Sequence, residues 1–190
     1  MQNILKISIM TAARGPKYQR FKITPVIKGY SMTDMLVKIL NLPDVHTMIE
    51  EQKKNGIDIR RPLAPEEHRL VTWVRKIFGD AWADECEVAF SNKPVSCFIA
   101  TNEGEVIGFA CYDATCKNFF GPVGVIESYR GKGIGKVLLL SCLHAMAEEG
   151  YAYAIIAYAD KDNSEFYSKT TGAKVIEGST PGIYRGVLWY

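Results

Sequence analysis

The segment Tyr129–Gly150, YRGKGIGKVLLLSCLHAMAEEG, is the most informative part of this chain because it joins a glycine-rich turn to an unbroken helical run. The turn combines three alternating glycines with three basic side chains: Gly131, Gly133, Gly135, Arg130, Lys132 and Lys136. The first turn of a helix leaves its N–H groups unpaired and carries partial positive charge, so a phosphate fits there. Glycine also removes the Cβ atoms that would keep the anion away. The segment therefore predicts an anion-binding loop at a helix start.

Two common phosphate loops do not match this spacing. A Walker loop needs four residues between its first glycine and its Gly-Lys pair, whereas three separate Gly131 from Gly135. The dinucleotide pattern G-x-G-x-x-G also fails, because Lys136 stands where its third glycine belongs. A glycine-rich strand-to-helix turn without a ligand remains the alternative interpretation.

The order of the residues around the turn carries a resemblance to a known family. Arg130–Gly135, RGKGIG, follows the apolar run Phe119–Ile126. It resembles the acyl-CoA loop of the GNAT superfamily of N-acetyltransferases, whose pattern is Gln or Arg, two residues, Gly, one residue, then Gly or Ala. The resemblance extends over residues 57–190, which would form an N-acetyltransferase (GNAT) domain, and leaves residues 1–56 as an N-terminal extension.

The resemblance implies where the co-substrate, acetyl-CoA, would bind. In this family the motif strand and the next strand splay apart, and the pantetheine arm lies in the gap. Backbone groups of the motif strand would bond to the arm, here those of Val123, Gly124 and Val125. The loop would hold the pyrophosphate through Arg130, Gly131, Lys132, Gly133, Ile134, Gly135 and Lys136.

A second family landmark is a helix with an Asn and, seven residues later, a Tyr that protonates the departing CoA thiolate. Tyr167 takes the place of that acid, and a phenol suits the task because its ordinary pKa near ~10 keeps it protonated at neutral pH. The Asn is out of register: Asp160 stands seven positions before Tyr167, and Asn163 stands four before it. We interpret Asn163 as a helix N-cap. A buried tyrosine that only packs on the sheet is the alternative for Tyr167.

The sequence singles out no general base for the amine. The candidates are Glu127, Asp113, Glu87 and His144, each of which is better explained as a cap, a solvated side chain or a core histidine. Cys97 and Cys111 have no histidine at a suitable distance in the sequence, so an acyl-enzyme intermediate is not indicated. Direct transfer from acetyl-CoA to the amine is the simpler mechanism.

Apolar periodicity predicts a mixed α/β fold with one central sheet flanked by helices on both faces, and the resemblance implies that this sheet is of the GNAT type. The expected strands are 57–63, 95–101, 106–112, 119–126, 151–159, 173–177 and 182–190. The expected helices are 65–79, 82–90, the run that follows the glycine loop and ends at Gly150, and 163–169. In the extension we expect a strand at 35–40 and a helix at 43–55 whose apolar stripe docks on the domain. Met32 is an alternative start, which would make residues 1–31 a leader.

Composition excludes several classes of protein. With 190 residues, 47% hydrophobic and 23% charged, the chain suits one globular domain with an appendage. A net charge of +2 without a Lys/Arg block argues against nucleic acid, and no apolar stretch reaches the ~18 residues of a membrane span. Five cysteines without a C-x-x-C pair argue against a metal and favour a reducing cytoplasm.

The sequence therefore predicts a cytoplasmic GNAT-type acyltransferase. It would move an acetyl group from acetyl-CoA to a primary amine of a small molecule or a protein. Its partners would be acyl-CoA and the amine substrate, with a homodimer left open. Two alternatives remain: an acyl-CoA-binding sensor that transfers nothing, and an interaction protein whose domain has lost its ligand.

Overall fold

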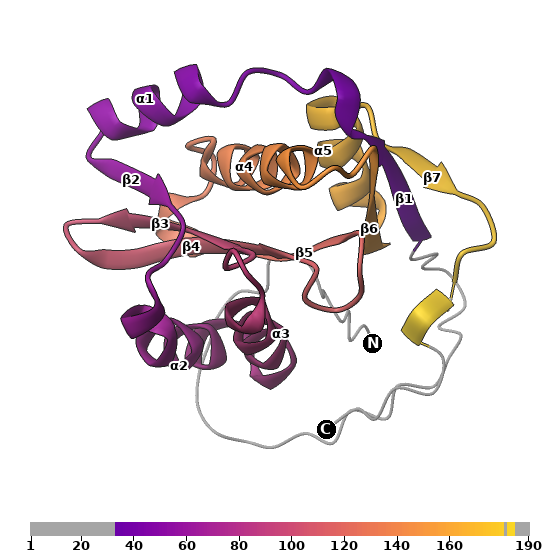
Figure 1. The fold of residues 1–190 in the computed structure, drawn as a ribbon. Coiled ribbons are helices and arrows are strands. Elements are labelled where there is room, and N and C mark those ends of the chain that lie inside the picture. The colour runs from indigo at the N-terminus through magenta and orange to yellow at the C-terminus, as the bar shows by residue number, and fades with distance from the viewer. Residues whose placement is uncertain (1–32, 181, 185–190) are drawn as a thin grey trace, which may run out of the picture.

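A seven-stranded sheet in the order β2-β3-β4-β5-β6-β1-β7 forms the centre of the computed structural model, which describes residues 33–180 and 182–184 (Figure 1). The strands are β1 (Thr33–Lys38), β2 (Ile57–Arg60), β3 (Cys97–Asn102), β4 (Glu105–Tyr112), β5 (Phe119–Val125), β6 (Tyr153–Ala159) and β7 (Lys174–Ile176). Only β5 and β6 pair in parallel, and the other neighbours are antiparallel. This is the mixed sheet that the sequence predicts.

Helices cover both faces of the sheet, as expected. They are α1 (His46–Lys54), α2 (Glu67–Phe78), α3 (Asp80–Ser91), α4 (Ile134–Glu148) and α5 (Lys161–Thr171). Figure 1 shows α1, α4 and α5 on one face and α2 and α3 on the other. Helix α4 is apolar on nearly all sides, and its leucines 138, 139, 140 and 143 are fully buried. It therefore forms the middle of the larger of two apolar clusters.

Strand β1 lies between β6 and β7. A strand of the predicted N-terminal extension, residues 1–56, is therefore part of the same sheet as the strands that follow residue 56. The sequence predicts this strand two residues further along, at 35–40. Met35 and Val37 are completely buried, and Val45, Met48 and Ile49 pack against the same cluster. The predicted apolar stripe of the first helix thus contacts the core beneath it.

Two local predictions are wrong. Gly182–Tyr184 forms a 3-10 turn and does not begin the strand expected at 182–190, of which residues 185–190 lie outside the described part. Asp160, and not Asn163, is the N-cap of α5, because its carboxylate accepts a hydrogen bond from the backbone N of Asn163 at 2.8 Å. Helix α5 therefore begins two residues earlier than predicted.

None of the helices in the described ranges is long and apolar enough to span a lipid bilayer.

Candidate functional site

The glycine loop ends in a helix start with free donors. Gly133 is the N-cap of α4 with φ 79°, and Gly131 has φ 76°. Residues with a Cβ rarely adopt such positive φ angles. The first hydrogen bond of the helix runs from the backbone N of Val137 to the carbonyl of Gly133, at 3.1 Å. The N–H groups of the three residues before Val137 therefore have no acceptor within the helix.

Gly135 needs a different explanation from the other two glycines. Its φ is not positive, and a Cβ built on it would meet only Val125 Cγ2, at an ordinary contact distance of 3.8 Å. Neither backbone strain nor packing requires a glycine here. The missing side chain leaves space on the first turn of α4, which suits the close approach of a ligand.

Charged side chains surround the loop. Arg130 Nε donates to the carbonyl of Val125 at 3.1 Å, which ties the loop to the end of β5. The ammonium of Lys132 lies 4.4 Å from the centroid of the Tyr129 ring. Lys136 is half-buried on the first turn of α4, whereas the side chain of Ile134 is buried in the core. Ile134 can therefore offer a ligand only its backbone.

Residues far away in the sequence hold the loop in place, and sequence analysis missed them. Gln52 of α1 donates through Nε2 to the carbonyl of Lys132 at 2.9 Å. The hydroxyl of Tyr129 donates to Asn102 Oδ1 at 2.8 Å. A pocket of about 530 Å³ opens between these groups, lined by Gln52, Asn55, Ile57, Asn102, Tyr129 and Lys132. No local pattern marks Gln52 or Asn102, because their partners are assembled only by folding.

Strands β5 and β6 separate beside this loop. Their pairing consists of Phe119 with Ile155 and Phe120 with Ile156, and it does not extend into residues 121–125. The backbone N of Ile126 donates to the carbonyl of Ile107, at 3.0 Å, so alternate residues of β5 bond to β4. By this alternation Val123 and Val125 direct their peptide groups away from β4, along the edge that faces β6.

The sequence groups Gly124 with Val123 and Val125 as residues whose backbone would bond to the pantetheine arm, but the peptide groups of Gly124 point the other way. It is paired with Phe109 at a hydrogen-bonded position of the β4–β5 ladder, so its peptide groups serve the sheet. A Cβ on Gly124 would lie only 2.6 Å from Cζ of Phe78. This glycine is explained by the close approach of α2.

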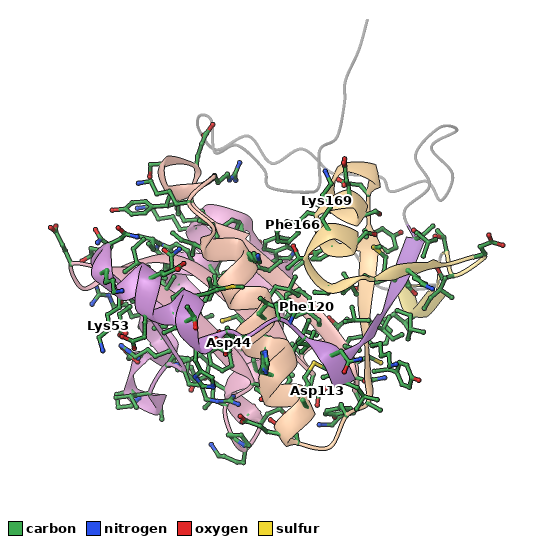
Figure 2. All side chains as sticks on the ribbon, turned by 90° about the horizontal axis from the view of Figure 1, so that it is seen from above. Asp44, Lys53, Asp113, Phe120, Phe166 and Lys169 are labelled. Carbon is green, nitrogen blue, oxygen red and sulfur yellow. The ribbon has the colours of Figure 1, made fainter. Side chains whose placement is uncertain are left out.

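Tyr167 lies near the point where the two strands separate. Its ring centroid is 6.3 Å from that of Phe120, the last β5 residue paired with β6, and 5.3 Å from that of Phe166. Figure 2 labels both of these neighbours, on the face that carries α4 and α5. Burial, with a smaller contribution from the Asp160 carboxylate, raises the pKa of the Tyr167 phenol. The phenol is therefore protonated at neutral pH.

The four candidate bases do not gather at this point. Asp113 accepts hydrogen bonds from the Tyr151 hydroxyl at 2.6 Å and from the Lys117 ammonium at 2.9 Å, so it ties together turns of the chain. His144 Nε2 lies 2.9 Å from the carbonyl of Pro43, on the segment that precedes α1. Glu87 and Glu127 are exposed. The contacts of Asp113 and His144 are structural ones.

A different carboxylate lies beside the separated strands. Glu85 of α3 accepts a hydrogen bond from the hydroxyl of Thr115, and burial raises the pKa of Glu85. Burial and then this carboxylate raise the pKa of Tyr184, whose ring centroid is 4.7 Å from that of Tyr158. Tyr158 belongs to the part of β6 beyond its pairing with β5. Sequence analysis missed Glu85 because it considered only Glu87 on this helix.

Comparison with known proteins agrees with this geometry. The model of the acetyltransferase (GNAT) family matches residues 67–173, more than half of the chain. No curated protein matches the sequence.

Several solved structures share the fold. A glucosamine N-acetyltransferase region of a fungal multi-domain GH3 enzyme superposes with a TM-score of 0.60 at 17% identity, over 78% of this chain and 21% of that one. A GCN5-related N-acetyltransferase from Sphaerobacter thermophilus gives 0.59 at 20% identity, over 78% and 50%. One from Kribbella flavida gives 0.52 at 16%, over 79% and 56%. The chain thus spans from a fifth to just over half of these longer chains, and at such identities the likeness shows the fold alone.

Proposed function

The chain belongs to the acetyltransferase (GNAT) family, and on that premise we propose that it transfers an acetyl group from acetyl-CoA directly to a primary amine of a small molecule or a protein. The observation that carries the proposal is the course of β5. From Phe120, its last residue paired with β6, β5 presents an edge that pairs with neither neighbouring strand and leads past Val123 and Val125 to the N–H groups of the first turn of α4. On this edge the carbonyl of Val125 accepts a hydrogen bond from Arg130 Nε. An extended arm with an anionic end matches this edge and its terminus.

The loop would bind the pyrophosphate through backbone donors and charge. The N–H groups of Ile134, Gly135 and Lys136 point out of the helix start, where the helix dipole adds partial positive charge. Gly135 leaves the space for a close approach. Arg130, Lys132 and Lys136 supply formal positive charge. Of the three β5 residues named from the sequence, Val123 and Val125 would bond to the pantetheine arm, and Gly124 would not.

Tyr167 would act as the acid. When the amine nitrogen forms its bond to the carbonyl carbon, the carbon–sulfur bond breaks and the sulfur leaves as a thiolate. The phenol of Tyr167, at the point where β5 and β6 separate, would give its proton to that sulfur. Its raised pKa keeps the proton in place until then.

Glu85 would take the proton that the amine loses, directly or through water. It lies on α3, on the opposite face of the sheet from α5, and its charge acts on Tyr184, whose ring contacts that of Tyr158. Its raised pKa brings a carboxylate closer to the range in which it exchanges protons near neutral pH. Acid and base would thus approach the reacting carbon from opposite faces.

Two further expectations from the sequence stay predictions. A cytoplasmic location suits five cysteines that are all free. A homodimer is testable by sedimentation of the purified chain.

The test is a turnover screen of acetyl-CoA over amines, amino acids and peptides, read by the release of free thiol. We expect thiol release with at least one amine class. Binding of acetyl-CoA without turnover would favour the sensor instead, and absence of binding would contradict both.

Gly135→Val and Gly135→Ala separate binding from folding. Alanine fits the helical backbone and costs less conformational entropy than glycine, so the variant should melt no lower than the wild type. Both variants should weaken CoA affinity, valine more than alanine, in calorimetric titration. Unchanged affinity in a folded valine variant would remove the loop from the proposal.

A further inference from the structure

Three cysteines that are distant in the sequence meet on the α2/α3 face of the sheet. Cys86 comes from α3, Cys97 from β3 and Cys111 from β4, and their sulfur atoms all lie within 4.8 Å of one another. All three side chains are completely buried. We call this group the thiol cluster.

The sheet fixes two of the three sulfurs. Cys97 and Cys111 are direct partners in the β3–β4 ladder. The backbone N of Tyr112 donates to the carbonyl of Ser96 at 2.9 Å, which makes the neighbouring pair a hydrogen-bonded one. The Cys97–Cys111 pair is therefore a non-hydrogen-bonded pair, in which side chains approach most closely. Helix α3 packs on this face of the sheet and contributes Cys86.

The side chains around the three sulfurs are mainly apolar. The cluster lies in an apolar core that includes Leu70, Val74, Ala89, Phe90 and Phe109. Among the described residues, no carboxylate or imidazole joins the three sulfurs. A buried free cysteine alone is ordinary core packing. Three sulfurs within 4.8 Å of one another are close enough to bind one ion together.

We propose that Cys86, Cys97 and Cys111 bind one thiophilic metal ion through three sulfur atoms. An all-sulfur set selects soft ions such as Cu(I) or Cd(II) over ions that prefer oxygen. Structural zinc takes four ligands, and the described residues provide three, so zinc binds this site more weakly than Cu(I) or Cd(II). As each sulfur–metal bond forms, the thiol releases its proton to solvent, and no electron is transferred. The site is separate from the proposed acetyl transfer and does not rest on it.

The experiment uses the full chain with Cys116→Ser, because Cys116 is exposed and would bind metal by itself. The reduced protein is titrated without oxygen with Cd(II), Cu(I) and Zn(II), once as folded and once while refolding, since the cluster is buried. We expect a sulfur-to-metal charge-transfer band that saturates at one equivalent of Cd(II) or Cu(I). The bound ion should also raise the melting temperature.

Cys86→Ala, Cys97→Ala and Cys111→Ala should each lose the band. Cys142→Ala is the matched control, because Cys142 is equally buried but lies on α4, and it should keep the band. The rise in melting temperature of the Cys116→Ser protein tests the site even where a core variant does not fold. The proposal fails if no band or melting shift appears, or if the band persists without Cys97. It also fails if the oxidised chain forms a Cys97–Cys111 disulfide while the reduced chain takes up no metal.

Discussion

The glycine loop before α4 and the thiol cluster below α3 lie against opposite faces of one sheet, and they differ in how their geometry is encoded. The loop is contiguous: its glycines, charges and helix start occupy eight residues, Tyr129–Lys136. The thiol cluster is assembled from two strands and a helix, with ten and thirteen residues between successive cysteines. A local motif can be recognised in the sequence, whereas a cluster of residues from distant segments forms only when the sheet has folded.

The two faces also differ in where their residues come from. The apolar cluster around α4 includes Met35, Val37 and Ile39, which precede the span matched by the family model. Within the part of the chain that the structure describes, the cluster around α2 and α3 consists of residues between Leu70 and Ala114. The face that carries the loop therefore depends on residues of the described segment 33–56, none of which belongs to the cluster on the opposite face.

The largest effect is expected from deleting residues 1–56, which removes β1 and α1. Burial of a large apolar side chain contributes about 1.5–3 kcal/mol, so the loss of Met35, Val37 and Ile39 approaches the about 5–15 kcal/mol that stabilise a domain. Strands β6 and β7 would also lose their common partner. We expect no cooperative thermal transition by circular dichroism.

Deletion of residues 1–31 is the control, because it keeps every described element, and it should leave the melting temperature nearly unchanged. If the 1–56 deletion melted cooperatively at the wild-type temperature, the dependence of the α4 face on the N-terminal segment would be refuted.

The next largest effect concerns Tyr167, on the α5 side of the separated strands. Tyr167→Phe keeps the ring contacts with Phe120 and Phe166 but removes the proton. On an identified amine substrate we expect kcat to fall roughly ten- to a thousand-fold, the range of general acid effects, with CoA affinity little changed. Initial rates of thiol release give kcat, and calorimetric titration gives the CoA affinity. An unaltered kcat would return Tyr167 to a packing role.

This comparison explains what the sequence could and could not predict. Two local properties of the sequence, hydrophobic periodicity and the turn residues that end each element, predict helix α4, its glycine turn and the order of the strands from 57 to 177. Gly182–Tyr184 does not begin the strand expected at 182–190, whereas β1 of the N-terminal extension enters the sheet between β6 and β7. Sequence periodicity does not say which segment enters a sheet. For the same reason the alternation of the β4–β5 ladder, and not composition, separates Gly124 from Val123 and Val125.

Candidate side chains show the same division. The sequence favours Asn163 as N-cap because the predicted helix begins two residues late, whereas Asp160, also a good capping residue type, takes that place in the structure. Glu85 and Gln52 act through partners that lie thirty and eighty residues away in the chain. Such contacts leave no local pattern.

A smaller effect, on stability, is expected at Gly124, where the α2 face touches β5. In Gly124→Ala the new methyl would collide with the Phe78 ring, which cannot move freely because its centroid lies 5.2 Å from that of Trp82 and 5.6 Å from that of Phe109. We expect a loss of about 1–3 kcal/mol in the free energy of unfolding, measured by urea denaturation.

Combining Gly124→Ala with Phe78→Leu should recover part of that loss, because the smaller side chain makes room. Equal additive losses in the double variant would mean that the two residues are not coupled.

The smallest effect is expected at the Arg60–Glu66 ion pair, at the end of β2. Arg60 donates two hydrogen bonds to Glu66, at 2.8 and 2.7 Å, and these chiefly lower the pKa of Glu66 from 4.5 to about 2. Because this pKa is lowered by folding, the pair stabilises the protein fully above about pH 5 and loses that contribution as the pH falls toward about 2. Both side chains are more than a third exposed, so Glu66→Gln should cost less than about 1 kcal/mol at pH 7. Urea midpoints of the two proteins should therefore differ slightly at pH 7 and converge as the pH is lowered toward about 3. A difference that grows on acidification would show that the charge of Glu66 is not what stabilises this corner.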